Sequence, residues 1–264
     1  FYLPDEPTST LLIYLHGVVP PEKTSVQKTT YQAVVANASR RAKAAALMPR
    51  GRQGLAPKGL EKWWGWPTSP GTYRRLAGEL VDQIARARRD LEAASGVSFE
   101  HVYLAGSSSG AYFVATLAQL GGIEVDGFGA MSGGTAVTNP ALRQLAPRPV
   151  YIGYGLYDTV GESARALAKL LRAERWPVRL AAQGFHNGFG KLDGQGRFQH
   201  QHGHTGFAAL LRHLDAIGRV GVDHQRMLIP GRTNGVQAVS VGALAADKAV
   251  TAGGLRKCRV GAQI

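Results

Sequence analysis

A serine lies at the centre of the most informative stretch of this chain. Residues 102–115 read VYLAGSSSGAYFVA, in which a short apolar run leads into the pentapeptide GSSSG centred on Ser108 and then into an apolar helical pattern. A Gly-x-Ser-x-Gly turn between a strand and a helix raises the central hydroxyl above the edge of a sheet, and glycines allow the two backbones to approach there. We therefore predict that Ser108 is a nucleophile.

The same letters also fit an ordinary glycine and serine loop, because the chain contains 34 glycines. The flanking segments favour the catalytic interpretation. Residues 101–105 are short and rich in β-formers, which is typical of a buried strand, and Phe113 and Leu117 in residues 112–120 have helical spacing.

The rest of the chain alternates strands and helices, which predicts an α/β protein with a mostly parallel sheet and helices on both faces. We expect threonines to cap the first two helices, Thr72 in the second. The expected strands are residues 11–15, 44–48, 101–105, 125–131, 150–154 and 178–182, and the expected helices are residues 29–43, 72–96, 112–120, 161–175 and 205–217.

The dipeptide His16-Gly17 follows the first expected strand. A strand ending in His-Gly, with the serine turn later in the chain, resembles the α/β-hydrolase superfamily over residues 9–186, particularly its esterases and polyester depolymerase-like enzymes. The resemblance implies an oxyanion hole made by the backbone N–H groups of Val18 and Ser109. We expect His16 itself to be a structural hydrogen-bonding residue and not the catalytic base.

The resemblance also implies a carboxylate after a later strand, in the chain order serine, acid, histidine. Asp158 follows the strand expected at residues 150–154. It would hold an imidazole in one tautomer and stabilise the imidazolium ion. Asp126, one strand earlier, is the alternative acid.

Several histidines are candidates for the general base. His186 follows the last expected strand, with one helix and one strand between it and Asp158, and it is our prediction. His204 directly precedes the last expected helix and is the first alternative, with His202 and His200 as further ones. A segment rich in glycine, glutamine and histidine interrupts the resemblance here.

The alternation of His200, His202 and His204 would also place three imidazoles on one face of a strand, where they could bind a metal. No carboxylate or cysteine stands at ligand spacing from them. The pattern therefore favours a polar loop, and we expect neither a metal nor a cofactor.

Residues 50–70 form a long segment rich in glycine and proline that carries Trp63, Trp64 and Trp66. We expect an irregular excursion over the strand ends. Its tryptophans either line the substrate site or pack the loop down.

The chain has 264 residues, 44% of them hydrophobic and 19% charged, enough for the core of one domain. We expect residues 1–217 to form an α/β-hydrolase catalytic domain and residues 218–264 a C-terminal tail without clear periodicity. The single cysteine, Cys258, excludes an internal disulfide. The start at Phe1, without a methionine, suggests a processed chain and leaves secretion or a periplasmic location open beside a cytoplasmic one.

The formal net charge is +13. The basic residues fall in separate clusters on expected helix faces, and no nucleic-acid-binding module accompanies them, so we expect no nucleic-acid partner. No apolar run approaches the length of a membrane span. The sequence thus predicts a serine esterase that acts on a small-molecule or polymeric ester. A peptidase or thioesterase on the same scaffold and a non-catalytic binding protein are the alternatives, and the oligomeric state is not specified.

Overall fold

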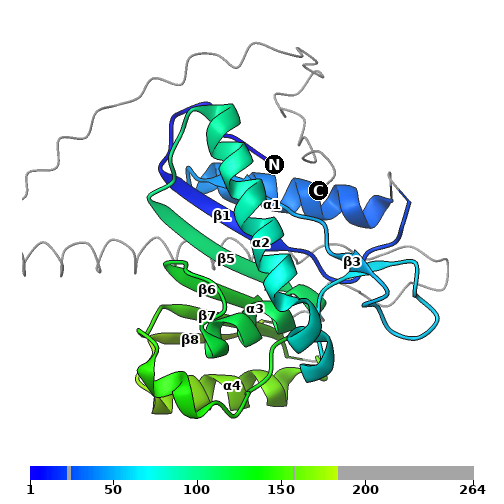
Figure 1. The fold of residues 1–264 in the computed structure, drawn as a ribbon, viewed down its shortest axis with the longest axis vertical. Helices are drawn as coiled ribbons and strands as arrows, with labels where there is room; N and C mark the ends of the chain where they lie inside the picture. The colour runs from blue at the N-terminus through cyan, green and yellow to red at the C-terminus, as the bar shows by residue number, and fades with distance from the viewer. Residues whose placement is uncertain (23–24, 157, 184–264) are drawn as a thin grey trace, which may run out of the picture.

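The computed structural model describes residues 1–22, 25–156 and 158–183. Its main sheet has six strands in the order β2-β1-β5-β6-β7-β8, and every neighbouring pair is parallel. The sheet consists of β1 (Thr10–Leu15), β2 (Ala45–Leu47), β5 (His101–Ser107), β6 (Gly127–Met131), β7 (Val150–Gly155) and β8 (Val178–Gln183). The helices are α1 (Val26–Arg41), α2 (Pro70–Ser95), α3 (Ser109–Leu120), α4 (Gly161–Ala173) and the short 3-10 helix η1 (Pro140–Gln144). The predicted α/β architecture is confirmed (Figure 1).

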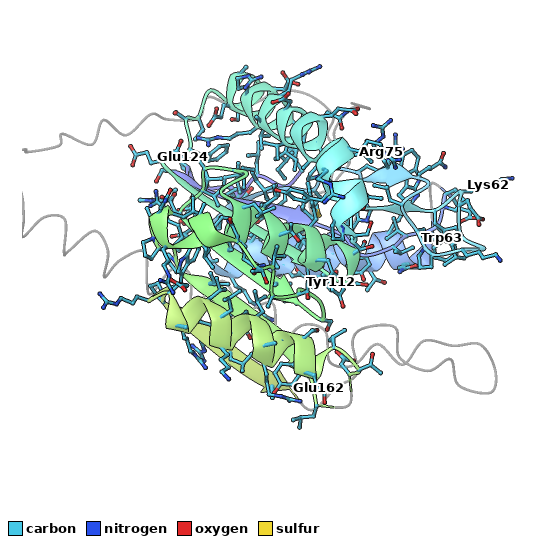
Figure 2. The ribbon with its side chains drawn as sticks, turned by 60° about the horizontal axis from the view of Figure 1, so that its bottom comes forward. Lys62, Trp63, Arg75, Tyr112, Glu124 and Glu162 are labelled. Atoms are coloured by element: carbon cyan, nitrogen blue, oxygen red, sulfur yellow. The ribbon has the colours of Figure 1, made fainter. Side chains whose placement is uncertain are left out.

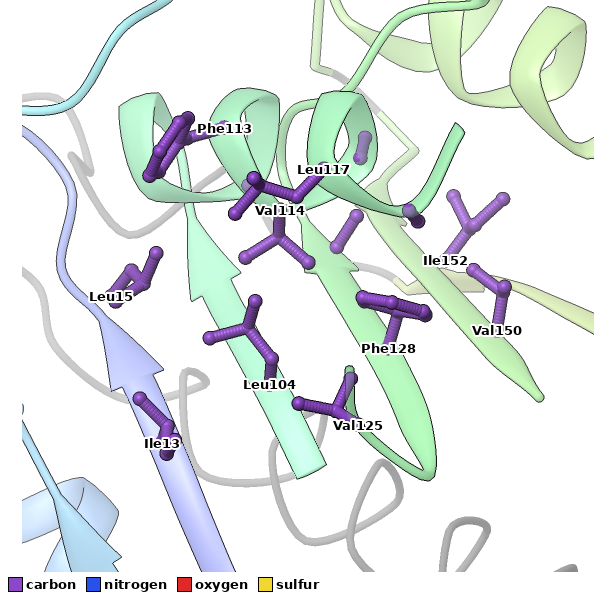
Figure 3. Packing of buried hydrophobic residues seen from close by; sticks show 14 of the residues in the cluster. Ile13, Leu15, Leu104, Phe113, Val114, Leu117, Val125, Phe128, Val150 and Ile152 are labelled. Carbon is purple, nitrogen blue, oxygen red and sulfur yellow. The ribbon is translucent and has the colours of Figure 1, made fainter. Parts of the chain in front are cut away.

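Helices cover both faces of the sheet because successive strand residues point in opposite directions. In β1, Leu11, Ile13 and Leu15 belong to a large core cluster that also contains buried residues of α2, α3 and α4. Leu12 and Tyr14, which alternate with them, pack on the other face with Val35 of α1. Figure 3 shows the larger cluster at the point where α3 lies over the strands.

Both long helices are capped by serines and not by the threonines that the sequence suggested. Ser25 caps α1, which begins at Val26 rather than at residue 29. Ser69 caps α2, and Thr72 instead occupies the third helical position and completes a capping box with Ser69. The predicted end of α2 is confirmed, because Gly96 has a φ of 67° and stops the helix in the left-handed region.

The segment between β2 and α2 is anchored by a small second sheet that the sequence did not predict. Its two strands, β3 (Arg52–Gln53) and β4 (Trp64–Gly65), pair antiparallel. Trp64 also exchanges backbone hydrogen bonds with Val19, at 2.9 and 3.0 Å. The segment is thereby tied to the loop that follows β1.

The order of the strands reverses between β1 and β5. The chain leaves β1 for β2 on one side and returns through α2 to β5 on the other side of β1. In parallel α/β sheets such a reversal places the loops after the two strands beside each other, and ligands bind there. The loops after β1 and β5 carry His16 and Ser108, respectively.

The predicted helix at residues 205–217 and the predicted domain boundary lie outside the described residues. In the part of the chain that the structure does describe, no helix combines the length and the apolar character needed to span a membrane.

Candidate active site

Ser108 occupies a sharp turn between β5 and α3. Its backbone has φ 49° and ψ −120°, a conformation that residues with a side chain rarely adopt. Its N–H donates to the carbonyl oxygen of Met131 in β6 at 3.0 Å, which holds the strained backbone in place. Strain of this kind is a feature of the turn that presents a nucleophilic serine.

The two glycines of the turn are required by close backbone contacts. A Cβ atom on Gly106 would lie 2.6 Å from the carbonyl carbon of Gly110. A Cβ atom on Gly110 would lie 2.2 Å from the carbonyl oxygen of Leu15 in β1. The geometric reason for the Gly-x-Ser-x-Gly pattern is therefore present on both sides of Ser108.

The loop after β1 lies directly beside the serine. A Cβ atom on Gly17 would lie 3.1 Å from Ser108 Cβ, so Gly17 leaves the space next to the hydroxyl open. The residue that follows is Val18, which the sequence assigned to the oxyanion hole.

The two peptide units on either side of the Val18 Cα have three of their four polar groups bonded. The Gly17 carbonyl accepts from His16 Nδ1, and the Val18 carbonyl accepts from Gln27 Nε2 at 3.0 Å. The Val19 N–H donates to the Trp64 carbonyl at 3.0 Å. The fourth group, the Val18 N–H, has no acceptor among the described residues.

Ser109 provides a second N–H group on the other side of the serine. It is the first residue of α3, where backbone N–H groups have no partner within the helix. Its N–H also has no acceptor in the described part of the chain, and the positive end of the helix dipole lies here. The Val18 and Ser109 N–H groups are thus two donors from which an oxygen anion beside Ser108 could accept hydrogen bonds.

His16 fixes the orientation of the first of these donors. Its Nε2 accepts from the Gly51 N–H at 3.0 Å, so its Nδ1 carries the proton that is donated to Gly17. Burial lowers the pKa of His16 from 6.5 to about 4, against the opposing effect of the Gly17 hydrogen bond, and Lys28 and Arg50 lower it further. His16 is therefore neutral at pH 7 with both ring nitrogens occupied, which agrees with the predicted structural role.

Asp158 lies in the turn after β7. Its Oδ2 accepts from the Gly155 N–H at 3.0 Å, and its own N–H donates to the Gly155 carbonyl at 3.0 Å. The two bonds hold the carboxylate at the carboxyl end of β7. Because β6 separates β7 from β5, Asp158 and Ser108 follow strands about 10 Å apart.

Asp126, the alternative acid, directly precedes β6 and so lies at the opposite end of the strands from Ser108. Its Oδ2 accepts from the N–H of Val102 at the start of β5, at 2.7 Å. Ser108 follows the other end of β5, so about six strand residues, or about 20 Å, separate it from Val102. Asp126 therefore holds the start of a strand and is too far from Ser108 to act with it.

Comparison with known proteins bears on this arrangement. No protein-family model and no curated protein sequence matches the chain. The structure of the SOBER1 protein of Arabidopsis thaliana is similar, with a TM-score of 0.55 at 15% identity over 78% of this chain and 98% of that one. The carboxylesterase of Mesorhizobium loti has a TM-score of 0.52 at 19% identity, over 80% of this chain and 90% of the other. Esterase PE8 has a TM-score of 0.53 at 15% identity, over 79% and 93%.

The protein has the α/β-hydrolase fold. The likeness and the parallel sheet together confirm the predicted fold class. At these identities the comparisons establish architecture and not chemistry.

All the histidines that the sequence offers as the general base follow β8 in the chain. His186 and the alternatives His204, His202 and His200 all lie outside the described residues. The histidine assignment remains a prediction. Among the described residues, no group of three or more histidine, cysteine, aspartate or glutamate side chains could hold a metal.

The three tryptophans differ in their surroundings. Trp66 is 1% exposed, lies between His16 and Phe113 with ring centroids 5.7 and 5.8 Å away, and belongs to the core. Of the two roles that the sequence left open, Trp66 therefore packs the loop down and does not offer a face to a substrate. Trp64 is half-buried with the Arg50 guanidinium 4.0 Å from its ring centroid, and Trp63, at the edge of the molecule in Figure 2, is also half-buried.

The sequence does not indicate Gln27, Gly51 or Tyr31 as site residues. Each contacts the loop after β1 from a different part of the chain, through a side chain or a backbone group. No motif marks them, because their role depends on where distant segments meet.

Proposed function

We propose that this protein is a serine hydrolase that cleaves carboxylic esters through an acyl-enzyme on Ser108. The observation that carries the proposal is the pair of N–H groups of Val18 and Ser109, on either side of a strained serine turn, for which the described part of the chain provides no acceptor. Such donors stabilise the charge that develops when a carbonyl is attacked. Two of the similar structures are of proteins named as an esterase and a carboxylesterase, which also supports ester hydrolysis.

In the proposed mechanism, the Ser108 hydroxyl oxygen attacks the ester carbonyl carbon, and a histidine nitrogen takes the hydroxyl proton. The carbonyl electron pair moves to the oxygen, which the Val18 and Ser109 N–H groups bind. When the tetrahedral intermediate collapses, the carbon–oxygen bond to the alcohol breaks, and the imidazolium donates its proton to the departing oxygen. Water then repeats the two steps on the acyl-enzyme and releases the acid.

Within this proposal, His186 is the general base, with His204 as the alternative, and Asp158 orients it. A carboxylate about two strand spacings from the serine leaves room for one imidazole between them. The hydrogen bond from the Gly155 N–H holds Asp158 in the turn after β7, at the end of the sheet where Ser108 lies.

The proposed substrate is a small-molecule or polymeric ester, and the half-buried side chains of Trp63 and Trp64 are the proposed contacts for it. Turnover of p-nitrophenyl acetate, butyrate and octanoate should be compared with that of a peptide p-nitroanilide and an acyl thioester, for the wild type and for Ser108→Ala. We expect ester turnover that the substitution abolishes. Preferential cleavage of the anilide or the thioester would show that the protein is instead a peptidase or a thioesterase. No turnover of any of these substrates would favour a non-catalytic binding protein.

A further inference from the structure

A chain of buried and half-buried polar side chains connects the serine turn to the loop after β1. Tyr14 at the end of β1 donates from its hydroxyl to Ser107 Oγ at 2.8 Å, and Ser107 directly precedes the nucleophile. Burial raises the pKa of Tyr31 of α1, and hydrogen bonds to the Ser107 and Gln27 side chains oppose the rise. Gln27 then donates from Nε2 to the Val18 carbonyl at 3.0 Å.

The hydrogen bonds can all run in one direction. Ser107 Oγ accepts from Tyr14 and can donate to the Tyr31 oxygen, and the Tyr31 hydroxyl can donate to the Gln27 side-chain oxygen. The amide nitrogen of Gln27 donates to Val18. The Ser107 and Tyr31 hydroxyls then each donate and accept, an arrangement in which neighbouring hydrogen bonds strengthen one another.

Helix α1 provides two of the side chains in this chain of hydrogen bonds. Gln27 and Tyr31 are four residues apart and share one helix face. The Tyr31 hydroxyl also lies against Gly17, 3.3 Å from the position that a Cβ atom there would take. The first two turns of α1 therefore contact both segments that carry the proposed oxyanion donors, at Gly17 and Val18 on one side and at Ser107 on the other.

We infer that Gln27 and Tyr31 are positioning residues for the oxyanion hole, which set the Val18 N–H relative to the Ser109 N–H. This inference rests on the proposed function. His16 holds the peptide unit that contains the Val18 N–H, and Gln27 holds the next one, so the Val18 Cα is fixed from both sides. Since displacement of a reacting group by about 1 Å can cost on the order of 100-fold in rate, such support matters to the transition state.

The test uses Gln27→Met and Tyr31→Phe, which keep the size and apolar contacts of each side chain and remove its hydrogen bonds. Gln83 of α2 is half-buried like Gln27, and its side chain bonds only to Glu79 among the described residues, so Gln83→Met provides the matched control. The measurements are kcat and KM for p-nitrophenyl butyrate, and Ki for an alkyl trifluoromethyl ketone, which forms a tetrahedral oxyanion on the serine. Thermal unfolding is followed for every variant.

We expect each α1 variant to lose about 10- to 100-fold in kcat with KM within about 3-fold, and to weaken trifluoromethyl ketone binding by the same factor as kcat. The double variant should lose little more than the worse single variant, because one chain of bonds is broken in either case. Gln83→Met should match the wild type.

Unchanged kcat in both variants would overturn the inference, as would a kcat loss without a parallel loss of ketone affinity. A loss of kcat that scales with a lowered unfolding temperature would also overturn it, since this would indicate a purely structural role. A wild type that neither hydrolyses the ester nor binds the ketone would instead refute the proposed function, and the inference with it.

Discussion

Gly110 of α3 lies against the backbone carbonyl of Leu15 in β1, so close that a Cβ atom on Gly110 would be 2.2 Å from that oxygen. This contact brings the N-terminus of α3, which begins at Ser109, to the end of β1, which the loop with Val18 follows. The proposed oxyanion hole therefore depends on the absence of one side chain.

Gly110→Ala should destabilise the fold by about 3 kcal/mol, the upper end of the usual cost of overpacking, and abolish esterase activity, because backbone atoms must move apart to admit the methyl group. The matched control is Gly78→Ala in α2, where a Cβ atom meets nothing within 4 Å. Since Gly78 is an exposed helix residue, alanine there should stabilise by about 0.5–1 kcal/mol. Urea unfolding measures both, and similar values for the two variants would contradict this account.

Asp158→Asn should lower kcat by several orders of magnitude, about 10⁴-fold in the comparable serine protease variant, because the amide cannot hold the imidazole in the right tautomer. The turn should survive, since the amide oxygen can still accept from the Gly155 N–H. Asp126→Asn keeps the same type of bond to Val102 at the other end of the strands and should retain activity within about 3-fold. Equal losses in the two variants would argue against a catalytic carboxylate at Asp158.

The base should be identified by His186→Ala and His204→Ala. We expect the first to remove ester hydrolysis and the second to leave it largely intact, with circular dichroism confirming that both variants fold. Inactivity of the His204 variant alone would move the assignment to the alternative. Full activity of both would exclude the proposed role for each.

His16 gives the protein a defined dependence of stability on pH. Its pKa is about 4 in the folded protein and 6.5 ordinarily, so as the pH falls the unfolded chain binds the proton first. The contribution of this group is complete above pH 6.5 and is lost as the pH falls toward 4, by at most about 3 kcal/mol.

His16→Asn should flatten this part of the pH profile, because its amide nitrogen can replace the Nδ1 donor to Gly17 but does not titrate. The free energy of unfolding of wild type and variant, measured by urea at intervals from pH 7 to pH 4, gives the difference directly. Parallel curves would show that folding does not lower the pKa of His16.

The sheet and the serine turn could be predicted because their signals are local. An apolar strand, two glycines around Ser108 and a helical repeat are contiguous in the sequence, and each predicted strand up to Gln183 is present. The His16-Gly17 pair was also recognisable, because it directly follows the strand that positions it. The choice between Asp158 and Asp126 could not be made from the sequence, because only the structure shows that the two residues lie at opposite ends of the parallel strands.

Contacts between distant segments could not be predicted. Gly51 meets His16 across 35 residues of sequence, and Gln27 meets Val18 through a helix whose start the sequence misplaced. The burial of Trp66 also depends on tertiary packing, since a tryptophan beside prolines fits a substrate wall and a packed loop equally well.

The most direct test of the account is the reaction of the protein with a fluorophosphonate, followed by intact-mass measurement and peptide mapping. The activated serine oxygen attacks the phosphorus and loses its proton to the base, the phosphorus–fluorine bond breaks to release fluoride, and the phosphoryl oxygen occupies the oxyanion hole, so the reaction requires both parts of the proposed site. We predict one adduct per chain, on Ser108, absent from Ser108→Ala. An unmodified wild-type protein, or an adduct on another residue, would contradict the account.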